Sequence, residues 1–350
     1  MPQNKPKKIL IVKLSSIGDV LHTIPCLMAL RKNFPNAQID WIVEELSFNL
    51  IEGHPALNNI YKIPKKRWRA NFFNLFQNEI SPFIKEIRSQ KYDVAIDFQG
   101  LTKSGLIAYL SGAKTRIGFG DKDGREINKI FTNKKVYLPQ NLHIVEKNLY
   151  LLTALGINEK NPEFKIPITD EDRKFINDWM NSEKLEKGFI ILNPGAGWIT
   201  KRLPPERFIE LAIKIKNELN KEIVLTWGPG EEELVKNMQE EINKKAGKIY
   251  IPPRTTLRQY CALAEQSIAF IGGDTGPMHL AAAMKVPIVS FFGASDAKRN
   301  QPYCEKKYVI QLNEIECVPC WKKQCPRQDI KCMNDINIDQ LFDGLKKIIE

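Results

Sequence analysis

Apolar and polar residues alternate along this chain with two different periods. Short apolar runs rich in β-branched residues, at 8–14 (KILIVKL) and 286–293 (VPIVSFFG), are typical of strands buried on both faces. Longer segments at 19–34 and 204–220 place apolar residues three or four positions apart, which predicts helices with one buried face. The two patterns follow each other in turn, so the sequence predicts parallel sheets covered by helices.

The predicted elements fall into two series. The first adds strands at 38–45, 58–63 and 92–99 and a long amphipathic segment at 72–91. A polar, proline-containing stretch from Pro162 to Thr169 then breaks the pattern and predicts a linker. The pattern restarts after it, with strands, glycine turns and helices predicted at 188–197, 222–233, 247–252, 256–266, 267–273 and 274–284.

From this order we predict an α/β fold of two doubly wound, Rossmann-like domains, residues 1–165 and 166–350, that face a central cleft. The last helix, at 336–349, is expected to pack back across the first domain. Open parallel sheets bind ligands beyond the carboxyl ends of their strands, so each domain is expected to hold one of two reactants.

Composition and charge narrow the function. The 350 residues include 43% apolar ones, and no run approaches the roughly 20 apolar residues of a membrane span. The apolar run after the first lysines is too short for a signal peptide, so we expect a cytoplasmic protein. The net charge of +11 favours an anionic partner, although much of the excess lysine is expected on solvated helix faces. No nucleic-acid-binding module accompanies this charge.

Four of the seven cysteines form a late cluster, Cys317, Cys320, Cys325 and Cys332. A cytoplasmic chain does not normally keep structural disulfides, so this spacing raises the hypothesis of a four-thiolate zinc site. The alternative is a reduced or disulfide-forming surface loop. No metal ligand is assigned.

The turn after the first strand holds the first candidate for chemistry. In KLSSIGDVL, Asp19 stands near the start of a helix, where such folds usually bind a phosphate. Asp19 is therefore either a helix cap or a group that acts on a substrate.

Three later turns have the composition of a phosphate site. In FIGGDTGPMHLAAA, two glycines lead into a helix start, and His279 lies one helical turn beyond Thr275. Asp274 or Thr275 is alternatively the N-cap of that helix. Lys201 follows another glycine turn and is placed to neutralise a pyrophosphate. Glu231 follows a third glycine turn. An acidic residue at this position is alternatively explained by the helix dipole, which favours negative charge in the first turn of a helix. Neither a P-loop nor a dinucleotide fingerprint is present.

The segments VKLSSIGDVLHTIP, WIVEE, KRWR, IDFQGLTKSG, WGPGEEE and GDTGPMHLAAA together resemble the ADP-heptose–lipopolysaccharide heptosyltransferases, which are inverting glycosyltransferases of the GT-B fold. The likeness covers nearly the whole chain. KRWR and WIVEE are most similar to heptosyltransferase I, whereas the cysteine run is more similar to heptosyltransferase II-like branches. The family often has threonines where this chain has the turn PGAG.

The resemblance implies that Asp19 is the catalytic base and that Lys201 and His279 stabilise the departing diphosphate without a metal ion or cofactor. For the ADP-sugar donor, it implies binding by Gly195, Ala196, Gly197, Lys201, Glu231, Asp274, Thr275, Gly276 and His279. For the acceptor, it implies binding by Ser15, Ser16, Gly18, Arg67, Arg69, Lys103 and Arg125.

The implied partners are ADP-heptose, an acceptor that is Kdo-lipid A or inner-core lipopolysaccharide, and the anionic inner face of the inner membrane, with no nucleic acid. Three alternatives stay open. One is an enzyme that adds a later core sugar, and another is a sugar-nucleotide epimerase or hydrolase. The third is a non-catalytic anion-binding protein.

Overall fold

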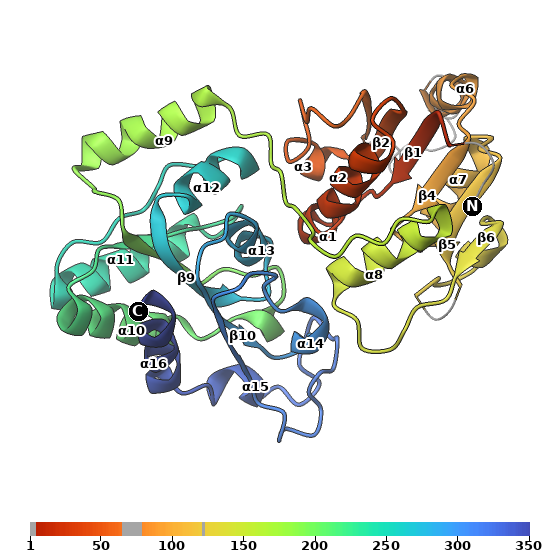
Figure 1. Cartoon of the computed structure of the whole chain (residues 1–350). Helices are drawn as coiled ribbons and strands as arrows, with labels where there is room; N and C mark the ends of the chain where they lie inside the picture. The colour runs from red at the N-terminus through yellow and green to blue at the C-terminus, as the bar shows by residue number, and fades with distance from the viewer. Residues whose placement is uncertain (1–4, 65–78, 121–122) are drawn as a thin grey trace. The chain divides into compact units, whose positions relative to one another are not determined.

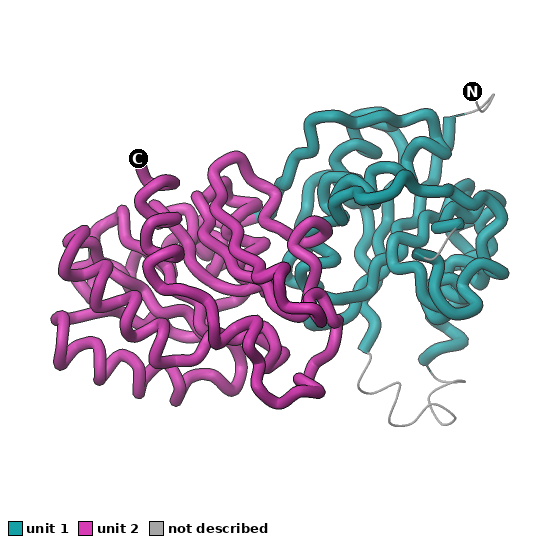
Figure 2. The backbone as a smooth tube through the Cα atoms, turned by 90° about the horizontal axis from the view of Figure 1, so that it is seen from below, with its two compact units in different colours: residues 1–167 teal, residues 168–350 magenta. Residues whose placement is uncertain are grey.

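The computed structural model describes residues 5–64, 79–120 and 123–350. The chain divides into two compact units, Met1–Pro167 and Ile168–Glu350, coloured separately in Figure 2. The division falls inside the polar stretch that was predicted to be a linker. Each unit has one sheet, and every strand pair within the two sheets is parallel.

Unit 1 contains a six-stranded sheet of order β3-β2-β1-β4-β5-β6. Its strands are β1 (Lys8–Val12), β2 (Gln38–Glu44), β3 (Asn59–Ile63), β4 (Val94–Asp97), β5 (Thr115–Phe119) and β6 (Lys134–Val136). Its helices are α1 (Ile17–Leu21), α2 (Ile24–Asn33), α3 (Glu45–Phe48), α6 (Ser81–Ser89), α7 (Thr102–Leu110) and α8 (Ile144–Leu151), with short 3₁₀ helices η2 (Asn128–Ile130) and η3 (Leu152–Leu155).

The first strand is the centre of this sheet. β1 pairs with β2 on one side and β4 on the other, and its residues from Ile9 to Val12 are fully buried. A continuous apolar run is the sequence signature of such a strand. The predicted helix over 19–34 is in fact two helices, because Pro25 occupies the first turn of α2 and cannot continue the hydrogen bonding of α1.

Unit 2 contains a five-stranded sheet of order β11-β10-β9-β7-β8. Its strands are β7 (Phe189–Asn193), β8 (Ile223–Leu225), β9 (Ser267–Gly273), β10 (Ile288–Phe292) and β11 (Lys307–Gln311). Its helices are α9 (Asp170–Glu183), α10 (Pro205–Leu219), α11 (Glu232–Ala246), α12 (Leu257–Ala264), α13 (Gly276–Ala283), α14 (Ala297–Asn300), α15 (Lys331–Asn334) and α16 (Ile338–Ile349), with η4 (Ile199–Lys201).

Both faces of the unit 2 sheet are covered (Figure 1). Ile190 and Leu192 of β7 join one apolar cluster with α10, α11 and α16. Ile191, which lies between them in the strand, is absent from this cluster and is also fully buried, as alternation places its side chain on the other face. On the carboxyl side of β9, α13 contacts β9 and β10. The doubly wound prediction is therefore confirmed for this unit.

The last helix differs from the prediction. The sequence analysis predicts that this helix packs back across the first domain. In the structure, α16 packs within unit 2 against α10, β9, β10 and β11. Its apolar residues Leu341, Phe342 and Leu345 complete the core of unit 2. Three short strands were also missed. β5 (TRIGF) contains an arginine and a glycine, β6 (KKV) has two lysines in three residues, and β11 (KYVIQ) has only three apolar residues between a lysine and a glutamine.

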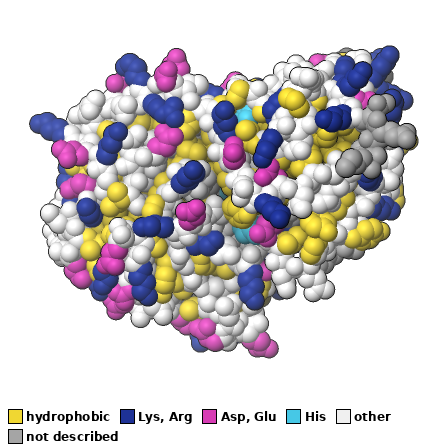
Figure 3. Space-filling model, viewed as in Figure 1, with side chains coloured by type: hydrophobic (Ala, Val, Ile, Leu, Met, Phe, Trp, Pro, Cys, Tyr) yellow, Lys and Arg dark blue, Asp and Glu magenta, His cyan; other side chains and the backbone are white. Residues whose placement is uncertain are grey.

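Charged side chains are spread over the molecular surface. On the face drawn in Figure 3, Lys and Arg side chains are scattered among acidic ones. This agrees with the expectation that much of the excess lysine is solvated. Across the described ranges, no helix combines the length and apolar character needed to cross a membrane.

Candidate active site

Unit 1 has a topological switch point between β1 and β4. The chain leaves β1 for β2 on one side and later returns to β4 on the other, so the loops beyond these two strands diverge. Ligands of doubly wound sheets bind at this position. The loop after β1 carries Ser15, Ser16 and Asp19, and the loop after β4 carries Gln99.

Gln99 joins the two loops. Its Oε1 accepts hydrogen bonds from the backbone N–H groups of Leu14 and Ser15, at 3.1 and 3.2 Å. The loop of Gln99 is itself held by the buried carboxylate of Asp97, which accepts from Asn128 Nδ2 at 2.6 Å and Ser104 Oγ at 3.0 Å. Burial raises the pKa of Asp97 even though these hydrogen bonds oppose the shift.

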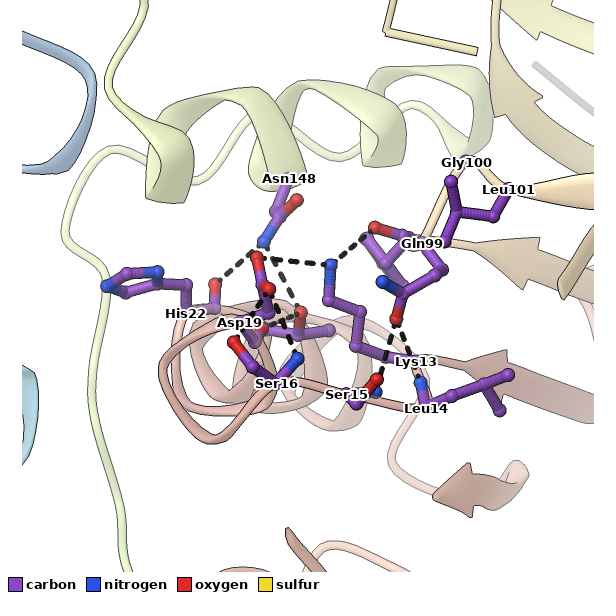
Figure 4. Close-up of polar contacts among 12 residues, drawn as sticks. Lys13, Leu14, Ser15, Ser16, Asp19, His22, Gln99, Gly100, Leu101 and Asn148 are labelled. Atoms are coloured by element: carbon purple, nitrogen blue, oxygen red, sulfur yellow. Dashed lines mark hydrogen bonds and ion pairs between the residues drawn. The ribbon is translucent and has the colours of Figure 1, made fainter. Parts of the chain in front are cut away.

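The carboxylate of Asp19 is held in one orientation (Figure 4). Its Oδ2 accepts from the backbone N–H of Ser16 at 3.1 Å and from Ser16 Oγ at 3.0 Å. Its Oδ1 lies 3.6 Å from the Nζ of Lys13, a buried ammonium that also donates to Phe98 O at 2.9 Å. The Asp19 side chain remains 34% exposed, so a substrate can reach it.

The neighbouring backbone is also fixed. Asn148 on α8 is fully buried, and its Nδ2 donates to His22 O at 3.1 Å and to Thr23 Oγ1 at 3.3 Å. Thr23 Oγ1 in turn donates to Asp19 O at 2.9 Å. The α1–α2 junction therefore keeps Asp19 at the sheet edge. The capping alternative is also realised, because Asp19 is the third residue of α1 and accepts the Ser16 N–H.

The predicted acceptor residues are a turn of small residues around Asp19 and a set of basic side chains. Ser15, Ser16 and Gly18 form the turn that holds Asp19, and all three are at least partly exposed. Lys103 in the first turn of α7 pairs at 2.9 Å with Glu44, the last residue of β2. Arg125 is exposed, and its backbone N–H donates to Gly100 O. The last two predicted residues lie outside the described part of the chain, namely Arg67 and Arg69.

Unit 2 has its own switch point, between β7 and β9. Asn193, the last residue of β7, and Thr275, just beyond β9, meet there: Thr275 Oγ1 donates to Asn193 Oδ1 at 3.3 Å. Thr275 is the N-cap residue of α13, but its side chain makes no capping hydrogen bond. The Thr275 side chain therefore does not cap the backbone N–H groups in the first turn of α13, and a helix start of this kind is a common position for anions.

Asp274 is the centre of a polar cluster at this switch point of unit 2. Its side chain is 4% exposed, and its Oδ2 pairs with Lys201 Nζ at 2.6 Å. Its Oδ1 is 3.1 Å from His279 Nε2, and Asn300 Nδ2 donates to Oδ2 at 3.3 Å. Burial alone would raise the pKa of Asp274, but His279 and Lys201 outweigh it and hold the pKa well below its ordinary value. Three predicted donor residues are thus in direct contact.

Glu231 lies against the glycine turn after β7. Its Oε2 accepts the N–H of Gly228 at 2.8 Å, and a Cβ at Gly195 would lie 1.9 Å from the same oxygen. Arg202, which the sequence did not single out, donates to Ala196 O at 2.6 Å and lies 3.8 Å from Glu231 Oε1. Glu231 therefore lies next to Gly195 and is linked to Ala196 through Arg202. Gly197, the third predicted residue of this turn, is exposed.

The four late cysteines are all free thiols. Burial, followed by the nearby thiols of Cys320, Cys317 and Cys325, raises the pKa of Cys332 to about 11. Among the described residues, no group of three or more His, Cys, Asp or Glu side chains is arranged to hold a metal ion. The structure gives the zinc hypothesis no support.

Several polar residues of the site were missed from the sequence, notably Lys13, Gln99, Asn193 and Asn300. A signal existed for two of them. Lys13 interrupts an apolar run at the end of a buried strand, and Asn193 ends another, and parallel strands place such residues at the ligand-binding edge. Gln99 and Asn300 lie in loops, where only the folded chain reveals their partners.

Comparison with known proteins identifies the family of this chain. A sequence model of glycosyltransferase family 9 (heptosyltransferase) matches residues 80–331. Lipopolysaccharide heptosyltransferase 1 of Pseudomonas aeruginosa is 27% identical over 345 residues, covering 95% of this chain and 92% of that protein. Lipopolysaccharide heptosyltransferase 1 of Escherichia coli K12 is also 27% identical, covering 87% of this chain and 96% of that protein.

Two solved structures share the fold. The family 9 glycosyltransferase of Veillonella parvula superimposes with a TM-score of 0.83 at 23% identity, covering 98% of this chain and 97% of the other. The E. coli heptosyltransferase WaaC with ADP gives a TM-score of 0.76 at 22% identity, covering 97% and 99%. The predicted GT-B fold is confirmed. The family model covers more than two-thirds of the sequence, and the chain therefore belongs to glycosyltransferase family 9, the heptosyltransferases.

Proposed function

We propose that this protein is an inverting heptosyltransferase that moves heptose from ADP-heptose to the Kdo or inner-core region of lipopolysaccharide, without a cofactor. Within this family, the observation that carries the mechanism is the Asp19 carboxylate. It is accessible, yet Ser16 and Lys13 fix it at the switch point of the first sheet. The names of the relatives support lipopolysaccharide as the acceptor class.

Asp19 acts as the general base. In an inverting transfer the acceptor hydroxyl attacks the anomeric carbon from the face opposite ADP, and a carboxylate takes the hydroxyl proton as the new bond forms. The ammonium of Lys13 places a positive charge 3.6 Å from Oδ1 of this carboxylate, and the ionised carboxylate is the form that accepts a proton. The same negative charge stabilises the positive charge that develops on the sugar ring.

The second unit binds ADP and stabilises its departure. Lys201 supplies a positive charge, and the salt bridge to Asp274 fixes its ammonium at the β7–β9 switch point. The free N–H groups at the start of α13, with His279 in its second turn, bind the diphosphate oxygens as negative charge builds up. Backbone N–H groups from Gly195 to Gly197 contribute further contacts to the diphosphate. The Glu231 carboxylate accepts a hydrogen bond from a hydroxyl group of the nucleotide ribose or of the sugar.

The first unit binds the acceptor. The Ser15–Gly18 turn surrounds the base, and Lys103 and Arg125 supply positive charge for the acidic groups of the inner core. Arg67 and Arg69 complete this set in the proposal. Because the acceptor is a lipid, the protein works at the inner, cytoplasmic face of the inner membrane as a peripheral protein.

The test is ADP release from ADP-heptose by the purified protein, with and without Kdo-lipid A. A transferase releases ADP only when the acceptor is present. ADP release without acceptor would indicate a hydrolase. If no acceptor leads to ADP release, the protein is a non-catalytic binding protein. NMR of donor and product then compares their anomeric configurations, and retention would contradict the inverting mechanism.

The choice of acceptor is tested in the same assay. Kdo-lipid A and its heptosylated derivative are offered in parallel reactions. Transfer to the first supports addition of the first heptose. Transfer to the heptosylated acceptor alone would assign the enzyme to a later core position.

A further inference from the structure

Helix α7 and the 3₁₀ helix η2 form one continuous surface in unit 1. Gly105 faces η2 so closely that a Cβ there would lie 2.6 Å from Asn128 Nδ2 and 3.2 Å from Phe131 Cβ. Asn128 is fully buried and donates to Asp97 and to Leu101 O. The two segments are therefore fixed against each other rather than loosely apposed.

This surface exposes four large apolar side chains, which we call the α7–η2 patch. They are Leu106 (40% exposed), Tyr109 (53%), Ile127 (57%) and Ile130 (71%). They make up four of the ten large apolar side chains found exposed in the described ranges. Clustered exposure of this kind marks a surface that contacts another apolar phase.

The stretch of sequence that carries the patch is rich in basic residues. The sequence from 102 to 137 contains eight Lys or Arg residues and three acidic ones, which is +5 of the net +11 in about a tenth of the chain. The guanidinium of Arg116 lies 5.3 Å from the centre of the Tyr109 ring. The described acidic residues are engaged locally: Glu126 accepts the N–H of Thr102, and Asp123 pairs with Lys147.

We propose that the α7–η2 patch docks this protein on an anionic lipid bilayer. This inference rests on the proposed lipid-linked acceptor and names the surface by which the enzyme meets it. Isoleucine and leucine enter the acyl boundary, tyrosine is favoured at the headgroup level, and the basic residues attract anionic lipids. Lys103, one turn before Leu106 on α7, then lies where the acceptor headgroup leaves the bilayer.

The test is co-sedimentation with vesicles of phosphatidylethanolamine containing phosphatidylglycerol, compared with vesicles of phosphatidylcholine. We expect wild-type protein to bind the anionic vesicles, and the double variant Ile127→Ser/Ile130→Ser to bind at least about tenfold more weakly. Lys129→Gln should weaken binding about fivefold, and only at low salt. The matched control is Leu46→Ser, because Leu46 is 77% exposed but follows Glu44 and Glu45; its binding should not change.

Transfer assays separate this inference from the proposed function. The double variant should lose activity on vesicle-embedded Kdo-lipid A and keep activity on a water-soluble Kdo acceptor. Unchanged vesicle binding by the double variant would overturn the inference. So would size-exclusion data in which the wild type is a dimer that the double variant dissociates, because the patch would then bind a second copy. Vesicle binding by a protein that transfers no heptose would refute the proposed function alone.

Discussion

The substitution Asp274→Asn removes the buried negative charge at the centre of the polar cluster in unit 2. It keeps the size of the side chain and leaves one oxygen that can accept a hydrogen bond. What is lost is the ion pair with Lys201 at 2.6 Å and the charged partner of His279 at 3.1 Å. The ammonium of Lys201, whose side chain is 16% exposed, is left without its counter-charge.

The expected loss in the free energy of unfolding follows from the burial of this ion pair. Removing one partner of a buried ion pair costs about 3–5 kcal/mol, because the other charge stays desolvated. Lys201 reaches solvent in part, and the new amide still accepts a hydrogen bond, so we expect a loss of about 2–3 kcal/mol. For a domain the size of unit 2, this lowers Tm by roughly 4–12 °C. ADP affinity should fall about tenfold, since Lys201 is no longer held in place.

The assay is calorimetric: Tm by scanning calorimetry and the ADP dissociation constant by titration calorimetry. Asp178→Asn is the matched control, because Asp178 pairs with Lys174 on an exposed helix face and should change neither quantity. The double variant Lys201→Met/Asp274→Asn should lose less stability than the two single variants added together. A Tm within 1 °C of wild type (about 0.3 kcal/mol) with unchanged ADP affinity would refute the reasoning.

The pH dependence has a defined sign. Because the pKa of Asp274 is lower in the folded protein than in the unfolded chain, its contribution to stability is fully present above the unfolded value of about 4. The contribution is lost as the pH falls from there toward the folded pKa. The stability difference between wild type and Asp274→Asn should therefore be constant from about pH 5 to 8 and shrink below about pH 4.

Three further substitutions test the rest of the site. Asp19→Asn should lower transfer by roughly 10²–10⁴-fold while ADP affinity stays normal; near-normal turnover would exclude it as the base. Lys201→Ala should weaken ADP binding and slow transfer together, and an effect on neither, by calorimetry and ADP release, would remove its leaving-group role. Gly195→Ala should reduce ADP affinity about tenfold, because the new Cβ displaces the Glu231 carboxylate from Gly228. Its control is Gly197→Ala, where a Cβ meets nothing within 4 Å, and equal affinities in the two variants would contradict this account.

Much of the fold follows from local patterns in the sequence. The central strands are continuous apolar runs that are bounded by polar residues, and those runs could be located without any long-range information. The edge strand β6 could not, because it has two lysines in three residues and its strand conformation depends on pairing with β5. The placement of α16 was also beyond local reasoning, since an amphipathic helix does not specify which apolar surface it covers.

The candidate site was predictable where polar residues directly follow a predicted strand. Asp19, Asp274 and Thr275 are of this kind, and the switch-point rule turns their sequence positions into spatial ones. Their supporting partners were not predictable. Gln99 reaches Leu14 across more than 80 residues of sequence, and Asn300 reaches Asp274 from another loop. Such contacts depend on how loops from different strands converge, which no local pattern encodes.

The two interpretations of Asp19, helix cap and general base, are compatible because they use the carboxylate differently. The cap requires only an acceptor, and Oδ2 fills that role toward the Ser16 N–H and hydroxyl. The base requires charge, which Lys13 stabilises from the side of Oδ1. An asparagine at this position still supplies a carbonyl oxygen for the cap but removes the charge. For this reason Asp19→Asn separates the two roles, whereas Asp19→Ala would remove both and mix a folding defect with a catalytic one.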